Sequence, residues 1–412
     1  MSDTAPSRNS KTDIGLTETE FVAILACLFA ILAFSIDAML PGIPAIAAEL
    51  SPGNENRALL VVTSFALGMG VATLVAGPLS DAFGRKPVIL AGGALYCAGA
   101  MWAALAPTLE MLLLARLVQG VGAAGPRVVA LATVRDVYSG AKMARIMSLI
   151  FIIFSLFPAA APAVGQLIIW GFGWRGIFGA FVIFAILTLI WMSIRLPETL
   201  PVASRRPFRL PVLWEGTRQL MADNTFCLII VIQGFCFAML FAVISAAQPM
   251  FDQTYGVVTM FPAWFAGMAI LAGSASFVNA TFVERMGMRF MVSSALVLQS
   301  TLAVFALMVW LFAGYDTTLS FAVFVVWCLA VFFQTGLTLG NLNAIALEPL
   351  GHLAGLASAV LASFATVFGV ILAAGISQTF NGTPMPITLG ILGCAVAAFT
   401  LMRVLGPEPA TT

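Results

Sequence analysis

Long apolar runs separated by short polar stretches are the main pattern of this 412-residue chain. The runs are continuous rather than alternating, which favours helices over the strands of a membrane barrel. A helix needs about 20 apolar residues to cross the hydrocarbon of a bilayer. The pattern therefore predicts twelve transmembrane helices, at roughly 21–41, 57–79, 88–106, 109–134, 145–169, 173–195, 224–247, 262–283, 290–313, 319–345, 353–379 and 385–404.

The longest internal polar stretch divides the twelve runs into six and six. We therefore predict an N-terminal six-helix bundle over 21–195 and a C-terminal six-helix bundle over 223–405, joined by a cytoplasmic linker over 196–222. The polar ends, 1–20 and 406–412, are expected to be cytoplasmic tails, the first of them disordered because it has few apolar residues to bury.

The composition agrees with a lipid environment. Hydrophobic residues make up 61% of the chain and charged residues 9%, whereas soluble domains carry about 25% charged residues. The net charge of +1 gives no reason to expect a nucleic-acid partner. The sequence holds no clustered metal-ligand or catalytic motif, so we expect the lipid bilayer as a partner, no cofactor and no metal.

Basic residues indicate the orientation. Lys and Arg gather in the segments on one side of the predicted membrane, and the opposite segments hold only Arg57 and Arg175. Because basic loops stay in the cytoplasm, and an even number of spans returns the chain to its starting side, both termini are predicted to be cytoplasmic.

A short charged motif occurs in both halves, each time after the second span. Asp81, Gly84 and Lys86 recur 203 residues later as Glu284, Gly287 and Arg289. This spacing favours duplicated halves in parallel orientation, the arrangement of one large class of secondary transporters.

The first copy resembles the signature G-x-L-x-D-R/x-x-G-R-K/R between helices 2 and 3 of the major facilitator superfamily. Gly77, Leu79, Asp81, Gly84, Arg85 and Lys86 match it. The resemblance implies an all-α integral membrane protein, with twelve transmembrane helices in two pseudo-symmetric six-helix bundles. It also implies a secondary transporter rather than an enzyme.

Two further motifs are similar to those of twelve-span drug:proton antiporters. The stretch from Arg116 to Gly120, which includes Gln119, resembles their helix 4 arginine motif, and Asp37 to Pro44 resembles the helix 1 motif of the bicyclomycin/chloramphenicol-resistance (Bcr/CflA) branch. The resemblance implies proton-coupled export of drugs or other small amphiphilic compounds across a bacterial cytoplasmic (inner) membrane. We expect the protein to be a monomer, with protons and a small-molecule substrate as its partners.

The resemblance leaves an alternative open. Gln166 stands where such antiporters usually carry a glycine in helix 5, so a proton-coupled uptake carrier for a specific metabolite remains possible on the same fold. A membrane receptor or scaffold that transports nothing is a third reading. The charges inside the predicted spans argue against that reading, because they are costly without a function.

Three of these charges are Asp37, Arg116 and Arg127. Asp37 and Arg116 have comparable depths, and helices 1 and 4 both line the central cavity in the resembled family. We therefore expect the two residues to act together in proton coupling or substrate contact, with Gln119 beside them; a static pair that orients two helices is the alternative. Arg127 follows Arg116 by eleven residues and projects from the same helical face. We expect it to bind substrate or relay protons; structural pairing is the alternative.

The resembled family closes its cytoplasmic side with a gate that pairs the loop acid and arginine with an acid at the end of helix 4. Transferred to this sequence, these residues are Asp81, Arg85 and Asp136. The alternative is that the basic residues only fix the topology. The full set of expected gate residues is Gly77, Asp81, Gly84, Arg85, Lys86, Arg135 and Asp136.

Two weaker sets of candidates remain. Pro158, Pro162 and Gly165 are spaced to bend the fifth span as a hinge or to pack a neighbouring helix closely. In the second half, polar and aromatic residues within spans predict a cavity for an amphiphilic substrate; the candidates are Gln233, Phe237, Gln334 and Asn341.

Overall fold

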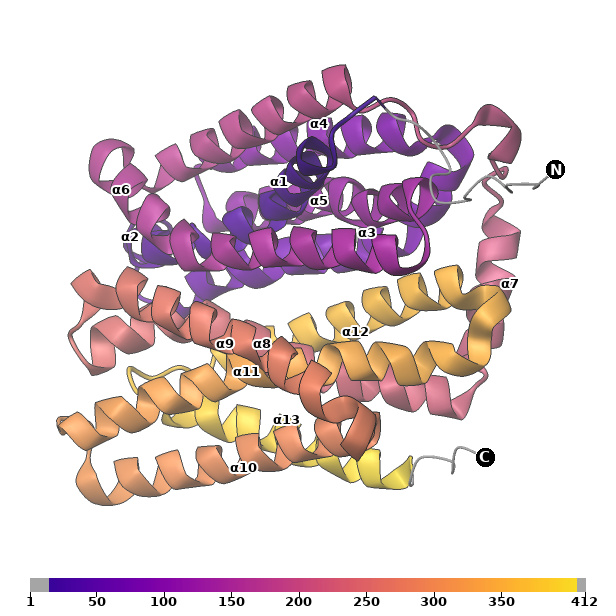
Figure 1. Ribbon diagram of the computed structural model, residues 1–412. Helices are drawn as coiled ribbons and strands as arrows, with labels where there is room; N and C mark the ends of the chain where they lie inside the picture. The colour runs from indigo at the N-terminus through magenta and orange to yellow at the C-terminus, as the bar shows by residue number, and fades with distance from the viewer. Residues whose placement is uncertain (1–14, 406–412) are drawn as a thin grey trace.

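The computed structural model describes residues 15–405, so residues 1–14 and 406–412 of the predicted tails lie outside the described part. All regular structure within 15–405 is helical (Figure 1). The α-helices are α1 (Glu18–Asp37), α2 (Ile43–Leu50), α3 (Leu60–Phe83), α4 (Arg85–Ala104), α5 (Leu109–Val137), α6 (Gly140–Arg195), α7 (Leu210–Met221), α8 (Asn224–Pro249), α9 (Phe261–Met286), α10 (Met288–Ala313), α11 (Thr318–Leu347), α12 (Ala354–Ser377) and α13 (Met385–Val404).

Several helices begin where a polar side chain can satisfy their first backbone amides. The hydroxyls of Thr17, Thr108 and Thr317 each accept a hydrogen bond from the amide three residues later. The carboxylate of Asp223 accepts from two amides at the start of α8. Such caps matter here because the first amides of a helix have no partner within it.

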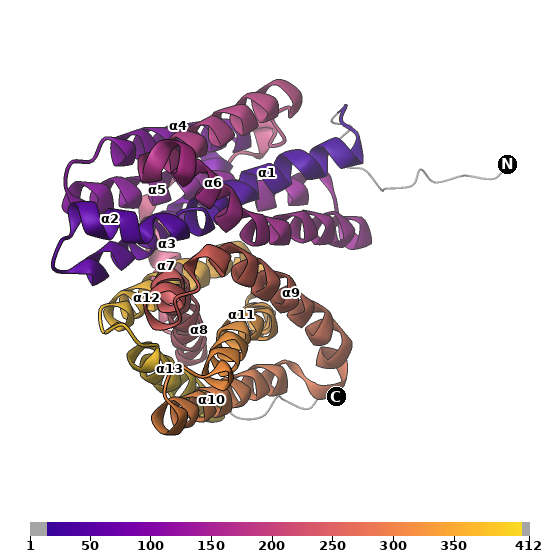
Figure 2. The same ribbon diagram turned by 90° about the vertical axis from the view of Figure 1, so that its left-hand side faces the viewer.

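The helices form two bundles. Helices α1–α6 make the first and α8–α13 the second, with α7 at the end of the molecule where both termini lie (Figures 1 and 2). The bundles meet mainly where α3 packs against α12 and α6 against α9. This arrangement confirms the predicted fold class of two six-helix bundles.

Helix α6 contains two of the predicted spans. It runs for 56 residues, but Gly173 has a non-helical backbone at φ 68° and ψ 179°. This break separates the predicted spans 145–169 and 173–195. The described residues contain 11 helices that are long and apolar enough to cross a membrane, and α6 supplies two of the twelve crossings.

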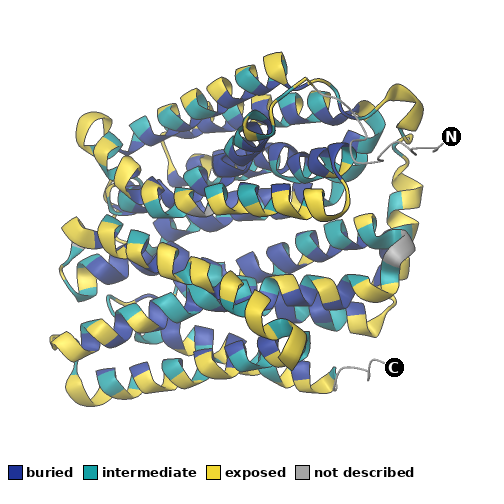
Figure 3. Cartoon of the chain, viewed as in Figure 1, coloured by how far each residue is buried: buried dark blue, intermediate teal, exposed yellow. Residues whose placement is uncertain are grey.

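The outer faces of the bundles are apolar. Large exposed side chains include Trp170, Phe172, Phe277 and Phe312, each more than 70% exposed, and exposed positions follow the outward sides of the helices (Figure 3). Patches of this kind are unfavourable in water but match the hydrocarbon of a bilayer. The chain is accordingly a multi-pass membrane protein.

Two boundaries differ from the sequence prediction. The first span was expected to reach residue 41, but α1 ends at Asp37 and the short helix α2 follows a turn. Pro41 and Pro44 explain this interruption because proline lacks the amide that would continue a helix. The basic pair Arg85 and Lys86 was expected in a loop but lies in the first turn of α4.

The duplicated motif adopts one backbone conformation in both halves. Gly84 separates α3 from α4 with φ 103° and ψ 160°, and Gly287 separates α9 from α10 with φ 85° and ψ 153°. Both lie in a region that side chains with a Cβ rarely adopt. The repeat in the sequence is therefore also a structural repeat.

Candidate functional site

Arg116 joins three helices of the first bundle. Its side chain is fully buried. The guanidinium donates to the side-chain oxygen of Gln119 at 2.7 Å, to the Ser35 carbonyl of α1 at 2.9 Å and to the Val61 carbonyl of α3 at 3.2 Å. The Phe65 ring centre lies 4.4 Å from its central carbon. The three nitrogens of the Arg116 guanidinium therefore each have a hydrogen-bond acceptor within the bundle.

Close helix packing makes this network possible. A Cβ at Gly120 would overlap the carbonyl oxygen of Phe65, so only glycine lets α5 approach α3 at this level. On the other side, the hydroxyls of Ser35 and Tyr96 share a hydrogen bond of 2.5 Å that joins α1 to α4. Small residues that bring helices together are typical of membrane bundles.

Asp37, the last residue of α1, lies near this network but outside it. Its side chain is 5% exposed, and within residues 15–405 no ion pair or side-chain hydrogen bond reaches its carboxylate. Arg116 bonds instead to the carbonyl of Ser35, two residues earlier. The two predicted partners thus make no hydrogen bond or ion pair with each other in this structure.

Arg127 lies farther along α5 and is half-buried. One of its terminal nitrogens is 3.5 Å from the Met69 sulfur of α3. No carboxylate of the described residues lies within ion-pair distance. Arg127 is therefore a cation inside a spanning helix without a charged partner.

The acid and arginine of the loop motif meet the acid of α5. Arg85 binds Asp136 through two nitrogens, at 2.8 and 3.3 Å, and Asp81 through a third at 2.5 Å. It also donates to the hydroxyl of Ser80 at 2.6 Å. The three residues named from the family resemblance form a single network at the end of the molecule near the termini.

Other expected gate residues are not part of this network. Arg135 is exposed and donates to the Leu131 carbonyl of its own helix at 3.4 Å. A Cβ at Gly77 would meet only Val128, at 4.0 Å, so no close approach requires glycine there.

The segment after α6 completes the network, which sequence reasoning missed. The Glu198 carboxylate accepts from the amides of Arg85 and Lys86, at 3.0 and 3.1 Å, at the start of α4. The hydroxyl of Thr199 donates to Asp136 at 3.1 Å. A carboxylate is favourable at a helix N-terminus. In the sequence, Glu198 is only an acidic residue shortly after a predicted span. Many acidic residues occupy such positions, so nothing marked this one as part of the network.

Lys86 has a different role from Arg85. It donates to the carbonyls of Ser193 and of Leu196, the residue that follows the end of α6. Its counterpart in the repeat, Arg289, donates at 2.7 Å to the carbonyl of Leu405, the residue that follows the end of α13. In both halves the last basic residue of the motif thus ties the start of the third span to the end of the sixth.

The expected hinge of the fifth span is a continuous helix in this structure. Pro158 and Pro162 both lie inside α6 without a break in its backbone. Gly165 has a packing role, because a Cβ there would overlap the carbonyl oxygen of Ala38 in the turn after Asp37. This glycine lets α6 cover the end of α1.

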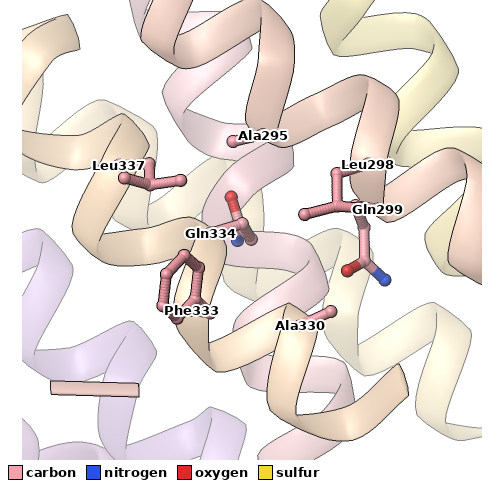
Figure 4. Close-up of a pocket in the computed structure, with 7 residues that line it drawn as sticks. All are labelled: Ala295, Leu298, Gln299, Ala330, Phe333, Gln334 and Leu337. Carbon is pink, nitrogen blue, oxygen red and sulfur yellow. The ribbon is translucent and has the colours of Figure 1, made fainter. Parts of the chain in front are cut away.

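The predicted residues of the second half do not converge. Gln334 lines a small cavity between α10 and α11, opposite Gln299 (Figure 4). Gln233, Phe237 and Asn341 do not line it, and Asn341 donates instead to Asn279 at 2.7 Å. Gln299, whose amide has no hydrogen-bond partner among the described residues, is not marked by any pattern in the sequence.

A second group outside the sequence prediction joins the two bundles. Asn56, just before α3, donates to the carbonyls of Gln378 at 3.1 Å and Phe380 at 2.6 Å, and Gln378 donates back to the Asn56 carbonyl at 2.8 Å. We call these residues the amide clasp. Among the hydrogen bonds and ion pairs within 15–405, these three connect the bundles directly. The clasp lies at the end of the molecule opposite the termini.

The comparisons with known proteins agree with the fold and the loop motif. A family model described as the Major Facilitator Superfamily matches residues 25–374. The chain belongs to the major facilitator superfamily. It is therefore a transporter and not an enzyme, and a small-molecule substrate is consistent with this family.

Similar transporters come from several bacteria. The uncharacterized MFS-type transporter YdgK of Bacillus subtilis (strain 168) is 30% identical over 376 residues, or 88% of this chain and 90% of that protein. A bicyclomycin resistance protein homolog of Haemophilus influenzae is 29% identical over 382 residues, which cover 91% of this chain and 93% of that protein. The multidrug resistance protein MdtL of Escherichia coli (strain K12) is 36% identical over 182 residues, which cover 43% of this chain and 46% of that protein.

Solved structures of major facilitator transporters match over nearly the whole chain. A D-xylose-proton symporter has a TM-score of 0.76 at 12% identity, covering 95% of this chain and 98% of its own. The nucleoside transporter NupG has a TM-score of 0.74 at 16% identity, covering 95% and 100%. These likenesses establish the fold alone. The family match, the bacterial relatives and the 11 membrane-capable helices of the described residues identify the chain as a multi-pass inner-membrane transporter.

Proposed function

We propose that this transporter exports drugs or other small amphiphilic compounds in exchange for protons. The observation that carries the proposal is Asp37, a buried carboxyl group beside the Arg116 network with no partner of its own. An ionised carboxylate away from water and without a partner is very unfavourable. Uptake of a proton removes the charge, so Asp37 can carry a proton in one direction while the substrate moves in the other. The resistance proteins among the relatives support export.

The topology belongs to the same proposal. Both termini lie in the cytoplasm, the bundles span 21–195 and 223–405, and the linker over 196–222 is cytoplasmic. The network of Asp81, Arg85 and Asp136 then lies on the cytoplasmic side and the amide clasp on the outer side. The transporter works as a monomer, because each chain has both bundles needed to enclose a substrate between them.

Alternating access requires the two ends to open in turn. In this structure the amide clasp holds the outer end together through hydrogen bonds between the bundles. Opening the outer end breaks these bonds. We propose that the Arg85 network then holds the cytoplasmic ends of α3, α4 and α5 in the arrangement that closes the inner end.

Replacement of Arg85 tests this role. Arg85→Gln removes the bonds to both carboxylates, and hydrogen bonds to charged groups contribute roughly 1.5–3 kcal/mol. We expect transport to fall about tenfold, measured as substrate flux in proteoliposomes, while the protein still inserts and purifies. Arg285→Gln removes an exposed arginine from the end of α9 and should keep wild-type flux. Wild-type flux in Arg85→Gln would reject this role of the Arg85 network.

The test of the proposed function is proton movement on addition of substrate. Everted membrane vesicles that contain the protein are energised, and a panel of cationic, neutral and anionic drugs is added while a fluorescent probe follows the pH gradient. Proton-coupled export predicts that several unrelated compounds dissipate the gradient. Vesicles without the protein are the control.

Other results would favour the alternatives. Dissipation by a single metabolite and by no drug would favour a dedicated carrier, which Gln166 in place of the usual glycine leaves open. No response to any compound, with the protein present at normal levels, would reject proton coupling.

A further inference from the structure

Arg127 lies close to the middle of a helix that is long and apolar enough to span a membrane. Helix α5 spans Leu109–Val137, and Arg127 is four residues from its centre, or about 6 Å at 1.5 Å per residue. Its one polar contact within the described residues is the Met69 sulfur at 3.5 Å. A thioether is only a weak acceptor, so the contact leaves the charge of Arg127 uncompensated.

Among the residues 15–405, no carboxylate forms an ion pair with Arg127. Asp37, the acid inside the same bundle, lies near Ser35, which contacts Arg116. Arg116 is eleven residues from Arg127 on α5, or about 16 Å along the helix. A carboxylate at that distance cannot form an ion pair with Arg127.

The two arginines on this helical face differ in accessibility. Arg116 is fully buried and donates three hydrogen bonds to its own bundle. Arg127 keeps part of its surface open and most of its five donors free. A guanidinium inside a membrane protein is costly without a partner, and its planar fork matches carboxylate, sulfonate and phosphate groups.

We propose that Arg127 binds an anionic group of the transported compound. This inference rests on the proposed export function and narrows its substrate class to amphiphiles that carry a carboxylate, sulfonate or phosphate. Met69 beside the guanidinium is flexible and apolar, so it can adapt to the hydrophobic part of different compounds. Asp37 exchanges the proton, and Arg127 selects the charge of the cargo.

Equilibrium binding to the purified protein tests this proposal. The probes are 2-naphthoate and its methyl ester, which differ by the negative charge, and the readout is the rise in Tm with probe concentration. Naphthoate should bind Arg127→Gln at least about tenfold more weakly than wild type. The ester should bind both proteins equally. Arg127→Lys should bind naphthoate with an intermediate affinity, because it keeps the charge but loses the fork.

Controls separate this site from general charge effects. Arg218→Gln removes an exposed arginine of α7 and should bind naphthoate as wild type does. Without probe, Arg127→Gln should have at least the wild-type Tm, because it removes an unpaired charge. If Arg127→Gln does not fold, the comparison of naphthoate affinity between Arg127→Lys and wild type tests whether Arg127 binds the anionic group.

Two results would overturn the proposal. One is equal naphthoate affinity in wild type and in both Arg127 variants. The other is an equal rise in Tm with chloride at the same concentrations, which would assign Arg127 to a resident inorganic ion. The assay needs no pH gradient, so loss of the proposed export function in vesicles would leave a naphthoate-selective site intact and distinguishable.

Discussion

Proton-driven transport is expected to fall to the leak rate when Asp37 is replaced by asparagine. The amide has nearly the same size but cannot take up or release a proton. Because Asp37 is buried without a partner, Asp37→Asn should fold at least as well as wild type. The measurement is substrate flux driven by an imposed pH gradient in proteoliposomes, with Tm as the test of folding.

The specificity of this result depends on two comparisons. Asp316→Asn changes an exposed acid before α11 and should transport normally. Asp37→Glu keeps the carboxyl group and should restore part of the flux. Proton-driven flux at the wild-type rate in Asp37→Asn would remove Asp37 as the coupling residue.

Arg116→Lys is expected to lower both stability and transport, although it conserves the charge. The guanidinium of Arg116 reaches Ser35, Val61 and Gln119 in three directions. A lysine ammonium is a point charge on a flexible stem and cannot reproduce this fork. We expect a loss of roughly 1.5–3 kcal/mol, seen as a lower Tm in detergent, and at least a tenfold loss of flux.

Arg116→Met separates the two effects. Methionine fills much of the arginine volume and needs no hydrogen bonds, and apolar replacements of buried charges are often tolerated in folding. Its Tm should therefore exceed that of Arg116→Lys, while transport should remain lost. Wild-type Tm and flux in Arg116→Lys would show that the three hydrogen bonds are dispensable.

Most of the fold was predictable because the bilayer imposes a simple rule on the sequence. Continuous apolar runs of about 20 residues located the spans, and the repeated glycine motif located equivalent junctions at Gly84 and Gly287. The predicted boundaries are wrong where a helix does not have to cross the bilayer, because apolar length then sets no limit. Helix α2 lies beyond the end of α1, at a depth where apolar length no longer distinguishes one helix from two.

The site was less predictable because hydrogen-bond partners depend on packing. Asp37 and Arg116 were expected to act together, but the arginine binds the Ser35 carbonyl. Backbone acceptors exist at every residue, so the sequence cannot rank them. Asn56, Glu198 and Gln299 were missed for a similar reason: a single amide or acid in a sequence has no pattern that marks it.

The two copies of the repeated motif share one contact and differ in another. Lys86 and Arg289 hold the same tie in both halves, so this contact belongs to the architecture of a bundle. Met288 stands where the first half has Arg85, so the second half cannot form the ion network. The ion network of Arg85 is therefore a feature of the first half alone.

In the proposed topology the amide clasp lies on the outer side, where it is exposed to changes in the medium outside the cell. Its bonds run between neutral groups, Asn56, Gln378 and the Phe380 carbonyl. Dissolved ions weaken attraction between exposed charges but have little effect on hydrogen bonds between amides. In the proposed topology, these three hydrogen bonds should therefore hold with little dependence on the salt or pH of the medium outside the cell.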